Sequence, residues 1–333
     1  MHEPVFSEFS QKAMATDFVV MTPGMLGERC EVAATAIAEA GRLEQLFSIY
    51  CVDSDISRIN RAAGGEPVFV STDTIQVLTR AVELSRLTGG AFDVTAGPLV
   101  EAWGFAKRQG AKPTDAQIAA ARQSVGYEQI AINPVDRTVC LRHQGMSINL
   151  GAIGKGYALD RIAAQMLAGD AEDFLIHGGK SSVLVRGNDT PSADDEPQSP
   201  RGWAVAIEHP LIPGIRVGGL RLVNQSLGTS GSGKQFFHHQ GKRLGHVIDP
   251  RTGWPASDLL SLTIIAGSAT DADALATALF VMGGDEAIQT AQRINAGRER
   301  PIGVVAIGTG RRQAEVVIQK TGIDDEAWID EPD

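Results

Sequence analysis

A carboxylate and a hydroxyl lie four residues apart in the stretch SATDADALATALFVM, which runs from residue 268 to residue 282. Its Ser-Ala-Thr-Asp start can cap a helix, and apolar residues then recur three or four apart, which predicts a helix. Asp273 and Thr277 would share one face of that helix, one turn apart. Because Mg²⁺ prefers oxygen ligands, this pair could form half of a magnesium site. The alternative is a capped amphipathic helix whose Thr277 hydroxyl bonds back to the carbonyl of residue 273.

A second candidate is the glycine-rich turn in NLGAIGKGYALDRIAAQML, where a predicted strand ends and a helix begins. Gly151, Gly154 and Gly156 would allow backbone N–H groups to approach an anion closely. The N-terminus of the helix adds partial positive charge, and Lys155 adds a full one. The spacing matches neither a Walker A loop nor a GxGxxG motif, so a plain tight turn between strand and helix stays open.

Two further segments carry polar groups that could reach a substrate. The segment Ser226–Gly233, SLGTSGSG, is a hydroxyl-rich glycine loop suited to phosphate or ribose, or else a flexible hairpin. His246 precedes an Asp-Pro-Arg-Thr-Gly turn in GHVIDPRTGWP. A single histidine is more often structural than catalytic unless other site residues converge on it.

Helices and strands of both kinds must position these residues. Apolar periodicity and capping residues predict helices over 28–47, 72–87 and from 113 to about 125. β-branched and alternating residues predict strands over 18–21, 129–133, 138–142, 146–150, 174–176, 183–185, 203–208 and 217–222. With no internal repeat and no clear linker, the pattern indicates a single α+β unit. Residues 188–200 are polar and proline-rich, which is typical of a surface insertion, and the acidic C-terminus is expected to fray.

Composition and charge exclude some classes of function. The net charge of -10, without a compensating basic block, argues against nucleic acid as a partner. The 3 widely spaced cysteines give no disulfide framework. No apolar run is long enough to span a bilayer, and the N-terminus has neither a signal peptide nor a lipid-bearing cysteine. We therefore expect a cytoplasmic protein, or a periplasmic or membrane-anchored one if the sequence has been trimmed.

Taken together, these stretches resemble the ApbE family, the FAD:protein FMN transferases. The resemblance keeps the family's order and runs from Met14 to Gly283. The segments that carry it are MATDF, DISRIN, GGAFDVTAGPLVEAWGF, NLGAIGKGYALD, LIHGGK, TSGSG, GHVIDPRTGWP and DADALATALFVMGG.

The resemblance implies a single α+β, T-fold-related domain over residues 13–325, with mixed sheets flanked by helices. Residues 1–12 would form an N-terminal extension and residues 326–333 an acidic tail. It also implies Mg²⁺-dependent transfer of FMN from FAD to a threonine hydroxyl of an acceptor protein, with release of AMP. Hydrolysis of FAD to FMN and AMP, or flavin binding with little catalysis, are the alternatives.

The resemblance assigns roles to individual residues as well. It implies that Mg²⁺ is bound by Asp273, Thr277 and the backbone carbonyl of Ala152, and that His246 accepts the proton of the threonine. Six residues match positions near the flavin or its phosphates in the family: Met14, Asn60, Asp93, Lys155, Thr229 and Ser230.

The chain departs from the family pattern at a few positions. Asn149 stands where members often have Asp, and Lys180 stands where they have Asn or Asp. After TSG, the chain continues with Ser232, Gly233 and Lys234 in place of an acidic residue and a tyrosine. Because Lys180 adds positive charge near the flavin region, substrate preference or rate could differ from that of other members.

Overall fold

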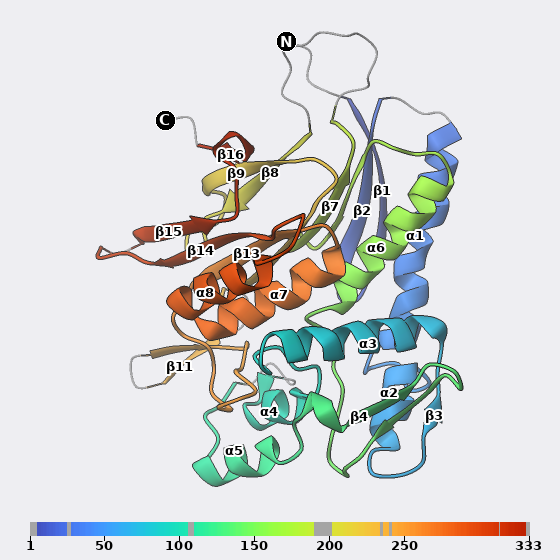
Figure 1. The fold of residues 1–333 in the computed structure, drawn as a ribbon, viewed down its shortest axis with the longest axis vertical. Helices are drawn as coiled ribbons and strands as arrows, with labels where there is room; N and C mark the ends of the chain where they lie inside the picture. Colours follow the sequence, from blue (N-terminus) through green and yellow to red (C-terminus); the bar gives the residue numbers. More distant parts are fainter. Residues whose placement is uncertain are drawn as a thin grey trace.

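A large antiparallel sheet lies in the upper part of the molecule in Figure 1. The computed structural model describes residues 5–24, 28–105, 110–189, 202–233, 236–239, 242–312 and 314–330. Within these residues the sheet has 8 strands in the order β1-β2-β6-β7-β10-β13-β14-β15. Their bounds are β1 Phe6–Ala13, β2 Thr16–Pro23, β6 Phe174–Gly178, β7 Ser182–Arg186, β10 Ser226–Gly231, β13 Ser261–Ala266, β14 Gly303–Thr309 and β15 Val316–Thr321.

Helices cover one face of this sheet. They are α1 (Glu28–Phe47), α6 (Gly154–Ala168), α7 (Ala269–Met282) and α8 (Gly284–Asn295). In Figure 1, α1 and α6 lie together over the β1–β2 end, and α7 and α8 lie over the other end. Helix α7 is apolar almost all round because it packs against the sheet, α6, α8 and α3 at once. Its polar residues, Asp273 among them, are therefore placed inside the protein.

A smaller sheet covers the opposite face. It has the order β16-β9-β8, with β8 at Trp203–Glu208, β9 at Arg216–Leu222 and β16 at Trp328–Ile329. Its apolar side chains, such as Trp203 and Leu220, form a second core with Val185 and Leu227 of the large sheet.

Strands lie near both ends of the described residues, where the sequence predicted an extension and a frayed tail. Residues 6–12, expected to lie in an N-terminal extension, pair along β2 as strand β1. The acidic stretch from residue 326, expected to fray, contains β16 instead, and Trp328 pairs with Leu220 of β9. Burial of Trp328 against β9 supplies the apolar contact that the acidic residues around it cannot.

The remaining elements form the lower part of the molecule in Figure 1. They are α2 (Asp55–Arg61), α4 (Gly97–Ala102), α5 (Asp115–Arg122) and a sheet of order β3-β5-β4, with the hairpin β11–β12 beside them. The strand bounds are β3 Val68–Phe69, β4 Ile130–Asn133, β5 Thr138–Leu141, β11 Phe236–His239 and β12 Lys242–Gly245. Helix α3 (Thr72–Leu87) lies across the boundary, and its Arg80 pairs with Asp271 of α7 at 2.6 Å.

The α+β class and the helices over 28–47 and 72–87 are confirmed. Every strand pair within the described residues is antiparallel, whereas mixed sheets were expected. The strand expected at 146–150 is wrong, because the backbone of Ile148 bonds to the side-chain amide of Asn60 in place of a neighbouring strand. Most of the expected glycine loop at 226–233 is strand β10. The expected insertion at 188–200 lies almost wholly outside the described residues, which resume at residue 202.

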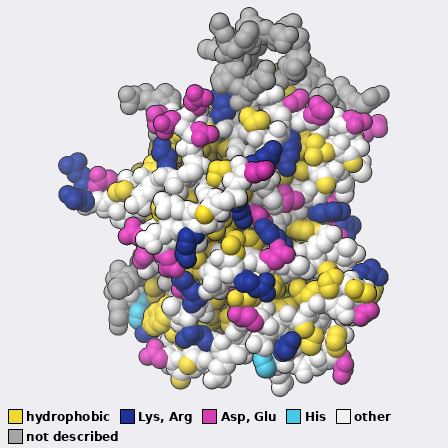
Figure 2. All heavy atoms as spheres, in the orientation of Figure 1, with side chains coloured by type: hydrophobic (Ala, Val, Ile, Leu, Met, Phe, Trp, Pro, Cys, Tyr) yellow, Lys and Arg dark blue, Asp and Glu magenta, His cyan; other side chains and the backbone are white. Residues whose placement is uncertain are grey.

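Charged side chains of both signs are interspersed over the face shown in Figure 2. Within the described residues, no helix combines the length and the apolar character needed to cross a bilayer.

Candidate functional site

Three segments meet at one end of the large sheet. Met14 and Ala15 form the β1–β2 turn with positive φ angles of 50° and 59°. The β6–β7 turn contains Lys180, whose φ is 64°. This turn bonds to its neighbours on both sides, because Gly179 N–H donates to Asp17 O at 3.0 Å and Thr229 N–H donates to Ser181 O at 2.7 Å. These bonds bring Met14, Lys180 and Thr229 to the same end of the large sheet.

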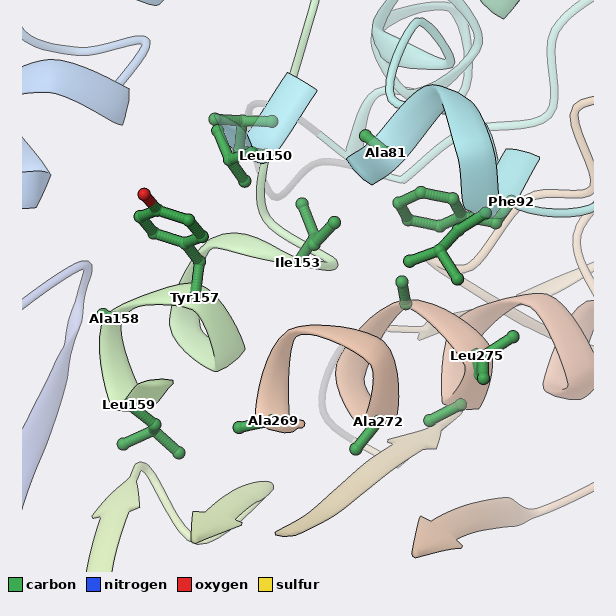
Figure 3. Close-up of a cluster of buried hydrophobic side chains, with 14 of the residues drawn as sticks. Ala81, Phe92, Leu150, Ile153, Tyr157, Ala158, Leu159, Ala269, Ala272 and Leu275 are labelled. Carbon is green, nitrogen blue, oxygen red and sulfur yellow. The ribbon is translucent and has the colours of Figure 1, made fainter. Parts of the chain in front are cut away.

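The N-terminal parts of α6 and α7 lie side by side, as Figure 3 shows for the turns that carry Ala158 and Ala269. A Cβ on Gly156 would lie 2.1 Å from the carbonyl oxygen of Ala269, so only glycine permits this approach. The carboxylate of Asp160 on α6 accepts hydrogen bonds from the N–H groups of Ala269 and Thr270, both at 2.9 Å, and so caps the other helix. It also accepts from the hydroxyls of Ser268 and Thr270.

Asp273 is the buried carboxylate at the centre of this junction, with 6% of its surface exposed. Gly156 lies in the first turn of α6, where N–H groups lack helical partners, and it donates to Asp273 Oδ2 at 2.8 Å. Ser182 Oγ donates to Asp273 Oδ1 at 2.7 Å, and Lys155 Nζ lies 3.8 Å from Oδ2. Burial raises the pKa of Asp273, while Lys155, Ser182 and Gly156 act to lower it. The anion that this glycine turn holds is thus the protein's own carboxylate.

Thr277 lies one turn further along α7, against strand β10. Its hydroxyl donates to the carbonyl of Asp273 at 3.3 Å, which is the back-bond expected for a plain capped helix. The Ser230 hydroxyl lies 2.9 Å from the Thr277 hydroxyl. This contact is possible because Gly228 lets β10 pass close to α7, since a Cβ there would lie 2.5 Å from the Ala272 carbonyl. A hydroxyl oxygen that donates its proton keeps lone pairs for a cation.

Two oxygen donors on α7, the Asp273 carboxylate and the Thr277 hydroxyl, have the chemistry that a hard cation requires. The expected ligands are the Asp273 carboxylate, the Thr277 hydroxyl and the Ala152 carbonyl, all of them oxygens, as Mg²⁺ prefers. Each carboxylate oxygen of Asp273 accepts one hydrogen bond and has a second lone pair, since Oδ2 accepts from Gly156 N–H and Oδ1 from Ser182 Oγ. Within the described residues, no three His, Cys, Asp or Glu side chains form a cluster that could hold a metal. A cation bound by the expected oxygens would keep water or substrate oxygens in its other positions.

Two of the residues expected near the flavin serve the backbone around the site. The amide of Asn60 donates to Ile148 O at 2.9 Å and accepts from Ile148 N–H at 2.7 Å. Asp93 accepts bonds from the N–H and the hydroxyl of Thr95 and from Tyr127 N–H. Burial raises the pKa of Asp93, and these hydrogen bonds oppose the rise. Both side chains shape the segments that lead to the glycine turn.

His246 lies directly after strand β12, in the lower part of the molecule. Its ring is half-buried and meets the ring of Phe105 edge to face, with centroids 6.4 Å apart. The turn that follows is closed by a bridge between Ile248 and Pro255. A cavity of about 310 Å³ lies beside this turn and is lined by Asp115, Ile118, Ala119, Arg122, Thr252 and Trp254. None of these lining residues is among the expected site residues.

The structure therefore joins part of the expected set. Lys155 and Asp273 are in contact, and Thr277 and Ser230 are in contact one helical turn away. Ala152 lies in the turn just before α6, and Met14 and Thr229 lie at the adjacent sheet edge. Asn60, Asp93 and His246 take part in other contacts in the lower part.

Sequence reasoning missed Ser182 and Asp160. Ser182 lies 91 residues from Asp273 in the chain, and Asp160 lies 108 residues from Ser268. No local spacing could relate residues so distant. The only signal was their place, since Ser182 directly precedes the strand predicted at 183–185 and Asp160 lies in the helix predicted after the glycine turn.

Comparisons with known proteins identify the family and the fold. A family model described as "ApbE family" matches residues 14–299. The FAD:protein FMN transferase of Haemophilus influenzae is 33% identical over 257 residues, which cover 75% of this chain and 72% of that protein. The crystal structure of the ApbE protein from Thermotoga maritima superposes with a TM-score of 0.81 at 26% identity, over 95% of this chain and 97% of that one. The flavin transferase ApbE from Vibrio cholerae gives a TM-score of 0.77 at 26% identity, over 96% and 98% of the two chains.

Proposed function

The chain belongs to the ApbE family, and from this premise we propose that it is an FAD:protein FMN transferase. The enzyme moves the FMN half of FAD onto an acceptor protein. The acceptor group is a threonine hydroxyl, the product left behind is AMP, and the reaction requires Mg²⁺. The observation that carries the proposal is the buried Asp273 carboxylate at the N-terminus of α6, in contact with Lys155 and one turn from the Thr277–Ser230 pair.

Lys155 is well placed to bind a phosphate of FAD. Its ammonium group lies 3.8 Å from Asp273, and its side chain keeps 22% of its surface exposed, so it can reach a ligand outside the buried carboxylate. The hydroxyl of Ser230 lies beside Thr277 of α7 and can donate to a phosphate oxygen, whereas the Thr229 hydroxyl contacts that of Thr263. Transfer of a phosphoryl group depends mostly on such positioning and charge neutralisation.

Asp273, Thr277 and the carbonyl of Ala152 would hold Mg²⁺. When bound, the ion neutralises charge on the pyrophosphate and favours departure of AMP. The chain's own part is to keep the two side chains one turn apart on α7 and to exclude water from the carboxylate, which is buried.

The transfer step has a simple atom balance. The threonine oxygen forms a bond to the phosphorus of the FMN half, and the bond between that phosphorus and the bridging oxygen breaks. AMP leaves with the bridging oxygen and its electron pair, and the threonine proton passes to the imidazole of His246. A neutral imidazole can accept a proton, and such general-base catalysis contributes roughly 10²–10⁴-fold.

An assay with defined products tests this proposal. The protein is mixed with FAD, Mg²⁺ and a threonine-containing acceptor domain, followed by intact mass spectrometry and nucleotide chromatography. An acceptor heavier by one FMN, together with AMP, is the expected result. Free FMN and AMP without a modified acceptor would instead identify a hydrolase, and unchanged FAD that elutes with the protein would identify a binding module.

Two variants separate the roles of the site residues. We expect Asp273→Ala to abolish Mg²⁺-dependent turnover, and His246→Ala to keep FAD binding but lose transfer by roughly 10²-fold or more. Turnover and FAD affinity are measured on the same preparations, and circular dichroism checks the fold. Full activity in Asp273→Ala would remove the metal assignment, and persistent transfer in His246→Ala would place the base elsewhere.

A further inference from the structure

Ser182 is a fully buried residue whose hydroxyl is hydrogen-bonded to the carboxylate of Asp273. It is the first residue of β7, directly after the turn that contains Lys180, and none of its surface is exposed. Its hydroxyl donates to Asp273 Oδ1 at 2.7 Å. Such a short bond to a buried carboxylate is of the stronger, charge-assisted kind.

The sheet register explains why Ser182, and not the residue opposite it on the next strand, contacts the Asp273 carboxylate. Ser182 is paired with Gly228 of β10. Gly228 has no side chain, and a Cβ at that position would lie within 2.6 Å of the backbone of Ala272 and Asp273. The close approach of β10 to α7 thus leaves the Ser182 hydroxyl as the sheet's donor to Asp273.

The two donors to Asp273 fix its carboxylate plane. The terminal torsion of an aspartate side chain is soft and roughly two-fold, so one contact does not define it. Gly156 N–H holds Oδ2 from the helix side, and Ser182 holds Oδ1 from the sheet side. Each oxygen keeps a second lone pair, and the direction of these lone pairs is set by the two bonds.

We propose that Ser182 is a positioning residue for the cation site, where it orients the Asp273 carboxylate toward a metal that Asp273 and Thr277 bind. The inference rests on the proposed function only in taking Asp273 as a ligand of Mg²⁺. Partners that orient a metal ligand are commonly worth 10–100-fold in metal affinity. Ser182 does not touch the metal or the substrate and acts through Asp273.

Ser226 provides a matched control within the same layer. It is also a fully buried serine, and it lies on β10 two residues before Gly228, opposite Leu184 of β7. Unlike Ser182, its hydroxyl has no hydrogen-bond partner among the described residues. Removal of either hydroxyl changes the packing by one atom, but only Ser182→Ala removes a bond to Asp273.

The test measures the binding of a cation to the free protein. Mn²⁺ serves as the probe, and free Mn²⁺ is followed by electron paramagnetic resonance during a titration without FAD. We expect Ser182→Ala to raise the Kd for Mn²⁺ by roughly 10–100-fold and Ser226→Ala to change it less than about two-fold. Ser182→Thr, which keeps the hydroxyl, should recover part of the affinity, and thermal unfolding checks that each variant is folded.

The outcomes separate this inference from the proposed function. An unchanged Kd in a folded Ser182→Ala variant would show that the hydroxyl only fills space and would overturn the inference. A wild-type protein that binds no Mn²⁺ would overturn it together with the metal assignment. Loss of affinity in Ser182→Ala beside a wild-type protein that transfers no FMN would support the inference and reject the proposed function.

Discussion

At the scale of single residues, burial acts in opposite directions on the two kinds of titratable group near the sheet edge. It raises the pKa of Asp273, because the charged carboxylate loses its hydration. Burial lowers the pKa of His177 on β6, because the charged form of a histidine is the protonated one and burial disfavours it. His177 Nδ1 is buried without a hydrogen-bond partner among the described residues. Nearby Glu8 and Asp17 oppose the shift, and Lys180 adds to it.

The lowered pKa of His177 predicts a loss of stability in mild acid. The folded protein binds the proton less readily than the unfolded chain, whose histidine pKa is about 6.5. Stability therefore falls as the pH drops below about 6.5, until the folded-state pKa is reached. We expect His177→Gln to flatten this part of the curve in urea unfolding between pH 7 and pH 5. The exposed His143, changed to Gln, serves as the control, and an equal slope in wild type and His177→Gln would contradict the prediction.

At the scale of elements, the contact between α6 and α7 decides where the site residues lie. Gly156 serves two purposes, because its missing side chain allows the approach to Ala269 and its N–H reaches Asp273. Gly154 lies two residues earlier in the same helix. A Cβ there would make only ordinary van der Waals contacts, 3.6 Å from Leu150 and 3.9 Å from Phe47.

The two glycines should therefore respond differently to alanine. Gly156→Ala is expected to cost about 1–3 kcal/mol in the free energy of unfolding, because the helices must move apart. Gly154→Ala is expected to be neutral or to stabilise by up to about 1 kcal/mol, because alanine favours a helix. Urea unfolding of both variants measures this difference. Equal stabilities would mean that the α6–α7 contact yields easily.

The sequence was a good guide to elements and a partial guide to the site. Capping residues and apolar periodicity are local signals, so the first and last residues of the helices over 28–47 and 72–87 were predicted correctly. The strand expected at 146–150 failed because a side chain, the amide of Asn60, takes the backbone groups that a strand would use. Asp273 and Thr277 could be paired because they lie on one helix, whereas Ser182 could not, because its relation to Asp273 exists only once the sheet has formed.

At the scale of the whole molecule, the site lies where the large sheet and its helices meet the lower part. Helix α3 bridges the two, and its Arg80 makes a two-pronged pair with Asp271 of α7, through Nε at 2.7 Å and Nη2 at 2.6 Å. The glycine turn with Ala152 leads from β5 into α6, whereas Asp273 and Thr277 lie on α7. The position of α3 therefore affects how the Ala152 turn is oriented relative to Asp273 and Thr277.

The Arg80–Asp271 pair should show a measurable coupling. We expect a double-mutant cycle of Arg80→Ala and Asp271→Asn, followed by urea unfolding, to give about 1 kcal/mol, since the pair is bidentate and only partly exposed. The Arg80–Glu83 pair on the same helix is more exposed, so Glu83→Ala should change stability by less than about 0.5 kcal/mol. A coupling near zero would mean that apolar packing alone docks α3 on α7.

The cap that Asp160 provides ties the mobility of one helix to that of its neighbour. Because a residue of α6 satisfies the start of α7, sliding either helix would strip the bonds to Ala269, Thr270 and Ser268 together. Lys155 on α6 and Asp273 on α7 therefore keep a fixed distance from each other, because these hydrogen bonds fix the relative position of the two helices.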